Sequence, residues 1–413
     1  MRQAVCTVKR GISIYACANN HFAGHAPATI AQFLKLWEAQ QPLTKRTGAT
    51  PTATSAKGTE ACISFSELLY LGPKFLPMPV AAKRKPITAS PEKTITDLSA
   101  FVPRDLVLSD DTQTLIPRLA KDERAVQMIE HAVQTIPTRH GLHLGDARKM
   151  QLEPESVHLI LTSPPYWTLK EYRDSDAQLG HVEDYEQFLQ ELDEVWKRCF
   201  EALVPGGRLI CVVGDVCLSR RENGGRHTVV PLHASIQEHC RRIGFDNLAP
   251  IIWHKISNAV YEVEGGSGFL GKPYEPNAVI KNDIEFILME RKPGGYRAPD
   301  ISTKVLSLIS VENHKKWFQQ IWEGVTGAST KDHPAPYPIE LAERLVRMFS
   351  FVGDTVLDPF LGTGTTTVAA AKWGRDSLGF EVDGHYIKLA YNRINEEISS
   401  LFSKAEIAVN IAV

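Results

Sequence analysis

The segment Ser163-Pro164-Pro165-Tyr166 places a hydroxyl, two rigid rings and an aromatic face in one short turn. The prolines lack a backbone N–H and hold φ nearly fixed, so the turn is stiff. The serine hydroxyl can accept a hydrogen bond from an amine, and the tyrosine ring can stack on a planar ring. Together these groups would grip a planar heterocycle that carries an exocyclic amine. An apolar run over residues 157–161 precedes the turn and predicts a buried strand that delivers it to one edge of a sheet.

A second segment, residues 354–366, has the features of a ligand-binding loop. A short apolar strand leads into Gly362 and Gly364, which let the backbone approach a ligand closely, and a helix-prone stretch then runs to Gly374. The next expected strand, residues 377–383, contains Glu381 near its end, where nucleotide-binding α/β folds hold a ribose diol. The loop lacks the full G-x-G-x-x-G pattern, so tight packing of strand on helix is an alternative for the glycines alone.

The two segments together resemble the motifs of the exocyclic-amino DNA methyltransferases, which use S-adenosyl-L-methionine. The turn resembles their catalytic motif, which makes Ser163, Pro164, Pro165 and Tyr166 the implied catalytic residues. Because the catalytic motif precedes the cofactor loop, the chain resembles the permuted β class, in which a target-recognition region lies between the two halves. The resemblance covers roughly residues 140–400.

The resemblance also implies a set of cofactor-binding residues. Asp146 matches the aspartate that holds the cofactor adenine, with an ordinary turn aspartate as the alternative. Pro336 belongs to a proline-rich segment that resembles the one closing over the methionine end of the cofactor. The other implied residues come from the glycine-bearing loop and the strand after it: Asp358, Pro359, Phe360, Gly362, Gly364, Thr365, Thr366 and Glu381.

Six residues are expected to contact DNA or the target base. Residues 251–255 resemble a late-strand motif near the target-base pocket, with a plain core strand as the alternative. A basic loop after the expected strand 209–215 would emerge at the same sheet edge as the catalytic turn. With the aromatic residue that follows the catalytic turn, these segments supply Trp167, Arg220, Arg221, Arg226, Trp253 and Lys255.

The family mechanism is a direct methyl transfer to the amine of a base flipped out of the duplex. Tyr166 would stack on that base, while the Ser163 hydroxyl and the Pro164 carbonyl would accept hydrogen bonds from its NH2 group. In the family, serine at the first motif position is associated with N4 of cytosine and aspartate with N6 of adenine. Ser163 therefore favours cytosine, and adenine is the alternative because a neutral hydroxyl can bond either amine.

Two further functions stay open on the sequence alone. Methyltransferases that modify RNA or protein also use a Pro-Pro-Tyr turn, but they usually keep the cofactor loop ahead of it, whereas here the loop follows roughly 190 residues later. A non-catalytic DNA-binding relative would have a degraded pocket. Intact Ser163, Tyr166 and Glu381 argue against that second alternative.

Length and composition fit an intracellular enzyme, and the resemblance to the DNA methyltransferases implies a cytoplasmic, DNA-associated protein of bacterial or phage type. The seven cysteines form no C-x-x-C pair and the fourteen histidines show no H-E-x-x-H spacing, so we expect reduced thiols and no metal. No stretch is apolar and long enough to span a bilayer, so no membrane partner is expected. The net charge of −2 hides a basic segment, residues 1–100, with 12 Lys and Arg against 5 Asp and Glu, a net charge of +7.

The order of the expected elements predicts an α/β fold with a mainly parallel, doubly wound sheet. The resemblance implies that this is the Rossmann-like fold of the S-adenosyl-L-methionine-dependent methyltransferases. Helices are expected over residues 184–203 and 229–243, and strands near 249–253 and 285–289. Five regions follow: a basic, partly irregular extension (1–100), a helical lead-in (101–140), a catalytic half (141–256), a target-recognition region (257–330) and a cofactor-binding half (331–413). The expected partners are double-stranded DNA and, in a restriction-modification setting, a restriction endonuclease encoded nearby. We expect a monomer or a weak dimer.

Overall fold

A computed structural model gives the fold of this chain. It describes residues 97–167, 178–221, 223–255, 282–328, 337–399 and 405–411, together with the backbone of residues 3–8 and 12–17. The chain divides into two compact units, Met1–Ala81 and Ala82–Val413. In the first unit, β1 (Gln3–Val8) pairs antiparallel with β2 (Ile12–Cys17), a hairpin within the segment that the sequence predicted to be partly irregular.

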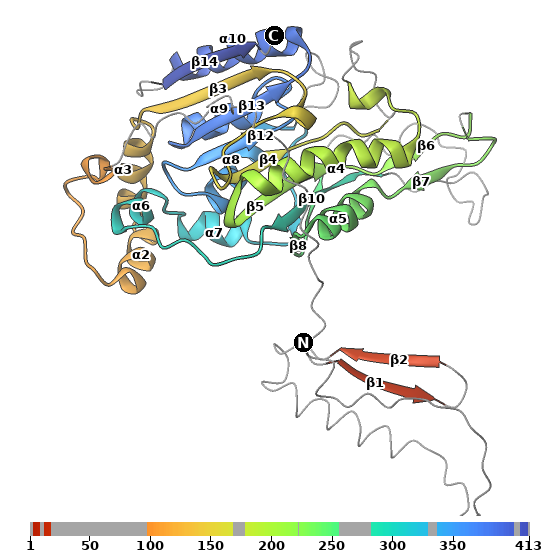
Figure 1. The fold of residues 1–413 in the computed structure, drawn as a ribbon. Helices are drawn as coiled ribbons and strands as arrows, with labels where there is room; N and C mark the ends of the chain where they lie inside the picture. The colour runs from red at the N-terminus through yellow and green to blue at the C-terminus, as the bar shows by residue number, and fades with distance from the viewer. Residues whose placement is uncertain are drawn as a thin grey trace, which may run out of the picture. The chain divides into compact units, whose positions relative to one another are not determined.

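The second unit is built on a ten-stranded sheet with the strand order β11-β9-β10-β5-β4-β12-β13-β3-β14 (Figure 1). Six neighbouring strands run parallel: β5 (Leu203–Val213), β4 (Val157–Thr162), β12 (Thr355–Asp358), β13 (Asp376–Glu381), β3 (Thr138–Leu144) and β14 (Ala405–Ile411). The remaining four are β10 (Ile284–Arg291), β9 (Ile251–His254), β11 (Ile321–Trp322) and β8 (Asp246–Asn247). Strand β10 is antiparallel to β5, β9 and β8. The predicted mainly parallel α/β sheet is confirmed.

Helices cover both faces of this sheet (Figure 1). One face carries α4 (Tyr185–Ala202) and α5 (Leu232–Ile243). The other carries α2 (Thr112–Ala120), α3 (Glu123–Val133), α6 (Ile301–Leu306), α7 (Val311–Trp317), α8 (Ile339–Phe349), α9 (Thr365–Lys372) and α10 (Gly384–Ser399). Along β4, Leu159 and Leu161 point into the core beneath α8, and Ile160 points into the core beneath α4. Burial on both faces explains why this strand is a continuous apolar run.

Two element boundaries differ from the sequence-based expectation. Helix α4 begins after Asp184, whose carboxylate accepts a hydrogen bond from the Gln187 N–H at 2.8 Å. The helix passes directly into β5 at Leu203, so residues 205–207 belong to a strand and do not form a turn that ends the helix. Residues 228–230 form β7 (Thr228–Val230), which pairs with β6 (Val216–Leu218), so α5 begins only at Leu232. The β-branched pair before Pro231 suits a strand better than a helix.

Much of the predicted target-recognition region belongs to the sheet and its core. Strand β10 lies inside the sheet, and Trp317 and Trp322 are buried against α8. Residues 256–281 lie outside the described part of the chain. The short 3-10 helices η1 (Ser99–Phe101), η2 (Ala147–Lys149) and η3 (Leu179–His181) complete the described elements of the second unit. In the described ranges, no helix has the length and apolar character to cross a membrane.

Candidate active site

Strands β4 and β12 are neighbours, and this adjacency positions the site. Leu159 pairs with Val356 and Ile160 with Leu357 in parallel register, so the carboxyl ends of the two strands meet at one edge of the sheet. The Thr162 hydroxyl at the end of β4 donates to Asp358 at the end of β12 over 2.7 Å. The catalytic turn and the glycine-bearing loop, roughly 190 residues apart in sequence, therefore lie side by side, as the sequence predicted.

A cavity lies where these two segments meet. It encloses about 580 Å³ of empty space and is partly open to solvent. Its wall combines apolar and aromatic side chains with two carboxylates, which is typical of a small-molecule site. The lining residues are Asp146, Ala147, Ser163, Pro165, Gln178, Leu179, Val195, Pro359, Phe360, Phe380, Glu381, Val382 and Tyr386.

The catalytic turn presents its serine to this cavity and buries its tyrosine. Ser163 is half-buried, whereas Pro164, Pro165 and Tyr166 are buried. The Ser163 hydroxyl donates to the Tyr166 hydroxyl at 3.3 Å, and that hydroxyl makes a longer contact of 3.5 Å with the Val212 carbonyl. Only 6% of Tyr166 is exposed, so its ring is packed in the core rather than open as the stacking face that the sequence suggested.

Trp167 anchors the end of the turn. Its φ is +49°, which is rare for a bulky residue and indicates a backbone held by its surroundings. The indole N–H donates to the carbonyls of Val182 at 2.9 Å and Glu183 at 3.1 Å, and the ring lies edge-on to Tyr185. The indole therefore ties the turn to the start of α4.

Asp358 is a brace beneath the loop, which corrects its predicted role as a cofactor ligand. It is 1% exposed and accepts hydrogen bonds from Thr162, from the Thr366 hydroxyl at 2.6 Å and from the Phe360 N–H at 3.1 Å. Burial raises the pKa of this carboxyl against the pull of those donors. Thr366 and Thr365 are buried too, and Thr365 accepts a hydrogen bond from Arg393, so neither lines the cavity.

The two loop glycines serve different purposes. Gly362 has φ +52° and donates its N–H to a carboxylate oxygen of Glu381 at 2.9 Å. Gly364 has φ +80°, and a Cβ there would lie 2.9 Å from Ile394 Cδ1. Gly364 thus packs closely on α10, a helix contact and not the strand-on-helix packing that was the alternative, while Gly362 shapes the loop around the carboxylate.

Glu381 and Asp146 are the acceptors of the cavity. Glu381 accepts from the N–H groups of Gly362 and Asp383, one on each oxygen, and burial raises its pKa to about 7 despite these donors. At Asp146 burial also opposes ionisation, but hydrogen bonds and charge from Arg148 outweigh it and lower the pKa of the carboxyl. Each Glu381 oxygen keeps a free lone pair for a ligand hydroxyl.

The structure adds wall residues that the sequence did not single out. Phe380 precedes Glu381 in β13, stacks on His143 with ring centroids 4.7 Å apart, and could have been found from its place beside the acidic residue. Tyr386 lies on α10 just after the same strand. Val195 and Leu179 carried no signal, because a single apolar residue on a helix looks like any other core position.

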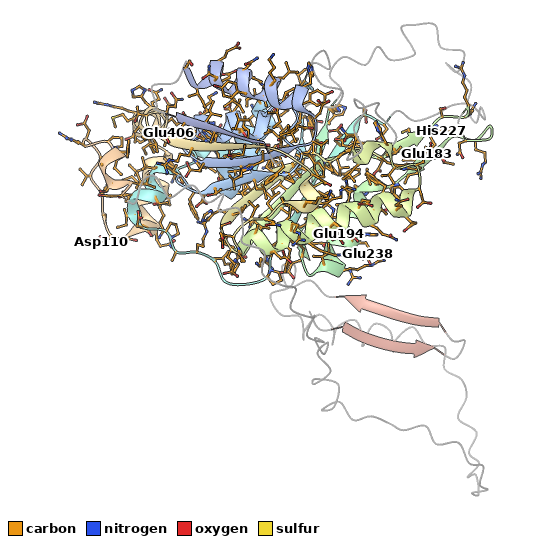
Figure 2. The ribbon with its side chains drawn as sticks, turned by 45° about the horizontal axis from the view of Figure 1, so that its top comes forward. Asp110, Glu183, Glu194, His227, Glu238 and Glu406 are labelled. Carbon is orange, nitrogen blue, oxygen red and sulfur yellow. The ribbon has the colours of Figure 1, made fainter. Side chains whose placement is uncertain are left out.

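The expected DNA-contacting residues are distributed over three places. Arg220, Arg221 and Arg226 lie between β6 and β7, and the latter two are exposed. Figure 2 labels His227, the next residue, at one end of the second unit. Trp253 is a correction: its indole is 0% exposed and donates to the Val325 carbonyl at 2.9 Å, so it is a core residue. Lys255 pairs with the buried Glu285.

Pro336 lies outside the described residues, so its predicted place at the cavity is not addressed by the structure. Within the described residues, no group of three or more His, Cys, Asp or Glu side chains could hold a metal ion.

Comparison with known proteins gives concordant matches. Residues 157–392 match the N6_N4_Mtase family, described as a DNA methylase. Type II methyltransferase M.MjaI of Methanocaldococcus jannaschii is 38% identical over 279 residues, which cover 60% of this chain and 88% of that protein. DNA adenine methyltransferase YhdJ of Escherichia coli is 28% identical over 65% of this chain and 85% of its own length. The structure of TTHA0409 from Thermus thermophilus, complexed with S-adenosyl-L-methionine, is 50% identical with a TM-score of 0.54, over 66% of this chain and 99% of that one.

Proposed function

The chain belongs to the N6/N4 family of DNA methylases, and from this premise we propose that it transfers a methyl group from S-adenosyl-L-methionine to the N4 amine of cytosine in duplex DNA. The observation that carries the proposal is the cavity shared by Ser163, which follows β4, and Glu381, which ends β13. One contributes an acceptor for an amine, and the other contributes an acceptor for a ribose.

The residues of the cavity fit the cofactor. Phe360, Phe380 and Leu179 offer apolar and aromatic surface to a flat adenine ring, and Glu381 keeps lone pairs for two ribose hydroxyls. The carboxylates of Asp146 and Glu381 also favour a cationic ligand. When bound, S-adenosyl-L-methionine supplies the methyl group as an electrophilic substituent of a sulfonium. The 50% identical TTHA0409, solved with this molecule, supports the assignment.

Ser163 orients the target amine. Because its own proton is donated to the Tyr166 hydroxyl, its lone pairs stay available to an N–H of the amine. With the Pro164 carbonyl as a second acceptor, two N–H bonds would be held and the nitrogen lone pair directed at the methyl carbon. The nitrogen–carbon bond forms as the sulfur–carbon bond breaks, and the amine then loses one proton to water or through Ser163. Positioning supplies most of the rate enhancement.

The choice of base rests on the serine. A neutral hydroxyl can accept from the amine of cytosine or of adenine, so the hydrogen bond alone does not discriminate. The serine at this motif position supports N4 of cytosine. N6 of adenine is the second candidate, because YhdJ, 28% identical to this chain, is named a DNA adenine methyltransferase. The exposed Arg221 and Arg226 between β6 and β7 would hold the phosphate backbone of either substrate.

One experiment tests the activity and the base together. The protein is incubated with methyl-labelled cofactor and duplex DNA, and the DNA is digested to nucleosides for mass spectrometry. We expect label in N4-methylcytosine, and no transfer by Ser163→Ala above background. Label in N6-methyladenine would replace the first base with the second. Label confined to RNA or protein substrates supplied in parallel would overturn the DNA assignment.

The same experiment, repeated on duplex DNA of random sequence, tests for a role in restriction-modification. Type II methyltransferases such as M.MjaI are among the relatives, which supports a restriction-modification role with a cognate endonuclease. A short, fixed motif around the methylated base is the expected outcome of sequencing the modified DNA. Methylation without sequence preference would contradict that setting.

A further inference from the structure

A second cavity lies at the opposite edge of the sheet from the candidate active site. The space between its wall residues is about 880 Å³, and part of that space is open to solvent. Its wall includes His158, the second residue of β4, whereas Ser163 follows the other end of that strand, so the two sites are separated by about 16 Å of strand. We call it the amino-edge cavity; it is lined by His158, Pro205, Gly206, Gly207, Arg208, Tyr296, Arg297, Ser307, Ile309, Arg347, Met348, Phe349, Ser350 and Phe351.

The lining of the amino-edge cavity is cationic. It contains three arginines and a histidine but no aspartate or glutamate. Two of the arginines are neutralised from behind the wall: Arg297 by a two-bond pair with Asp354 at 2.6 and 2.5 Å, and Arg347 by Glu130 at 2.6 Å. These pairs leave the third arginine as the uncompensated charge.

Arg208 has no hydrogen-bonding or ionic partner among the described residues. Its Nε is buried without an acceptor, although a buried charged donor is expensive to leave unsatisfied. The guanidinium lies over the Phe349 ring, 5.0 Å from its centroid, which fixes the plane but satisfies none of its N–H donors. Burial lowers the pKa of this group, as expected for a cation that lacks a counter-ion.

Two glycine-containing turns, around Gly206 and Gly294, adjoin the amino-edge cavity. Gly206 has φ +77°, and a Cβ there would lie 2.6 Å from the Gly295 carbonyl oxygen. A Cβ on Gly294 would lie 2.5 Å from Pro205 Cβ. Two glycine turns therefore pack directly on each other, and the second places Tyr296, 73% exposed, beside the cavity.

We propose that the amino-edge cavity binds a small organic anion through a phosphate or carboxylate group placed against Arg208. A planar guanidinium fork matches both groups, and such charge-assisted bonds would satisfy the buried Nε donor of Arg208. A flat portion of the ligand would lie on the exposed Tyr296 ring. Residues 1–100 carry a net charge of +7, so the basic extension is a poor electrostatic match for this wall.

The test is calorimetric titration of the full chain in excess S-adenosylhomocysteine, which keeps the cavity of the candidate active site filled. Inorganic phosphate, citrate and adenosine monophosphate are the three probes, and they separate the bare phosphate, the carboxylate and the ring-bearing phosphate. We expect saturable one-to-one binding of at least one probe, weakened about tenfold or more in Arg208→Met. Arg198→Met, on the exposed face of α4, is the matched control and should bind as the unmodified protein does.

Other outcomes decide against the proposal. It is overturned if no probe binds, or if Arg208→Met binds all three unchanged. A short DNA duplex that loses affinity in Arg208→Met, while no probe binds, would make Arg208 a DNA-backbone contact instead. If Arg208→Met does not fold, Tyr296→Ala takes its place. Weaker binding of adenosine monophosphate with unchanged binding of inorganic phosphate would support the site. If Tyr296→Ala binds both probes with the affinities of the unmodified protein, the proposal is overturned.

Discussion

The two ends of strand β4 open onto cavities of opposite chemistry. At the carboxyl end, Asp146 and Glu381 face a cavity whose polar groups are tied to donors on the protein. At the amino end, Arg208 faces a cavity with no carboxylate in its wall and keeps unsatisfied donors. The cavity at the carboxyl end is therefore held in shape by hydrogen bonds within the protein. The cavity at the amino end contains a positive charge that the described residues do not compensate.

The carboxyl edge is braced from below. The Asp358 carboxylate joins the end of β4 to the start of α9 through Thr162 and Thr366, and Tyr337 hydrogen-bonds the same Thr366 hydroxyl. These bonds hold Ser163 and Gly362 in register without touching the cavity. Rigid support of this kind suits a reaction that depends on positioning.

The largest effect is expected from Ser163→Ala. Loss of the proposed amine acceptor should lower the methyl-transfer rate by about a hundredfold or more, while the affinity for the cofactor stays unchanged, because the proposed role of Ser163 is to hold the amine and not the adenosine. Single-turnover transfer of labelled methyl and calorimetric cofactor binding measure the two quantities. Ser399→Ala, an exposed serine on α10, is the matched control. A rate unaffected in Ser163→Ala would remove the assigned role.

The second prediction compares the two carboxylates that flank β12. Asp358→Ala should destabilise the fold by about 2–4 kcal/mol, because it strands buried hydroxyl donors, and should also weaken cofactor binding by loosening the loop. Asp354→Ala, at the amino end, removes the partner of Arg297 and should reduce stability with cofactor affinity retained. Urea unfolding and calorimetry measure both. Equal loss of affinity in the two variants would show that the brace is not local to the carboxyl edge.

The part of this arrangement that the sequence could predict is the part carried by local patterns. Three local patterns predicted elements that the structure contains: the apolar run of β4, the glycine that ends a helix at Gly374 with φ +69°, and the acidic residue at the end of β13. Together they predicted the sheet edge where the two segments meet. Phe380 could have been added from its position beside Glu381.

The rest depends on neighbours that are remote in sequence. Trp253 and Tyr166 are amphipathic residues whose burial is decided by distant strands, so their types suggested exposed roles that the fold does not give them. Asp358 was expected to be a cofactor ligand because its loop resembles a cofactor loop, yet two threonines from different elements satisfy its carboxylate. Arg208 carried no signal, since Phe349 and the paired Arg297 approach it only in the folded chain.

A third prediction concerns pH at the carboxyl edge. The pKa of Glu381 is raised to about 7, and the ionised form is the better acceptor for ribose hydroxyls, so cofactor affinity should rise as pH increases from 6 to 8, by about tenfold at most. Glu381→Gln should bind more weakly at pH 8 and lose this component of the pH dependence. Calorimetry across that range measures it. An identical pH profile in the variant would assign the titration to another group.

The smallest effect, a change in stability, is expected at Glu290, where burial raises a pKa away from both cavities. Its pKa is also raised to about 7 by burial, with only a long bond of 3.4 Å from Gln237, but it lies beneath α5 and outside both cavities. In the unfolded chain the pKa lies near 4.5, so the folded state binds more protons between these values and stability falls as pH rises through that window. Glu290→Gln removes this penalty and should stabilise the fold by about 1 kcal/mol at pH 8, with little change near pH 4.

Urea unfolding at the two pH values measures the Glu290 effect, and Glu194→Gln on the exposed face of α4 is the control (Figure 2). Cofactor affinity should be the same in Glu290→Gln as in the unmodified protein. At Glu290 the raised pKa then reflects burial alone. At Glu381, where the carboxylate faces a cavity, the raised pKa also affects cofactor binding. A shift in the pH profile of cofactor binding by Glu290→Gln would contradict that distinction.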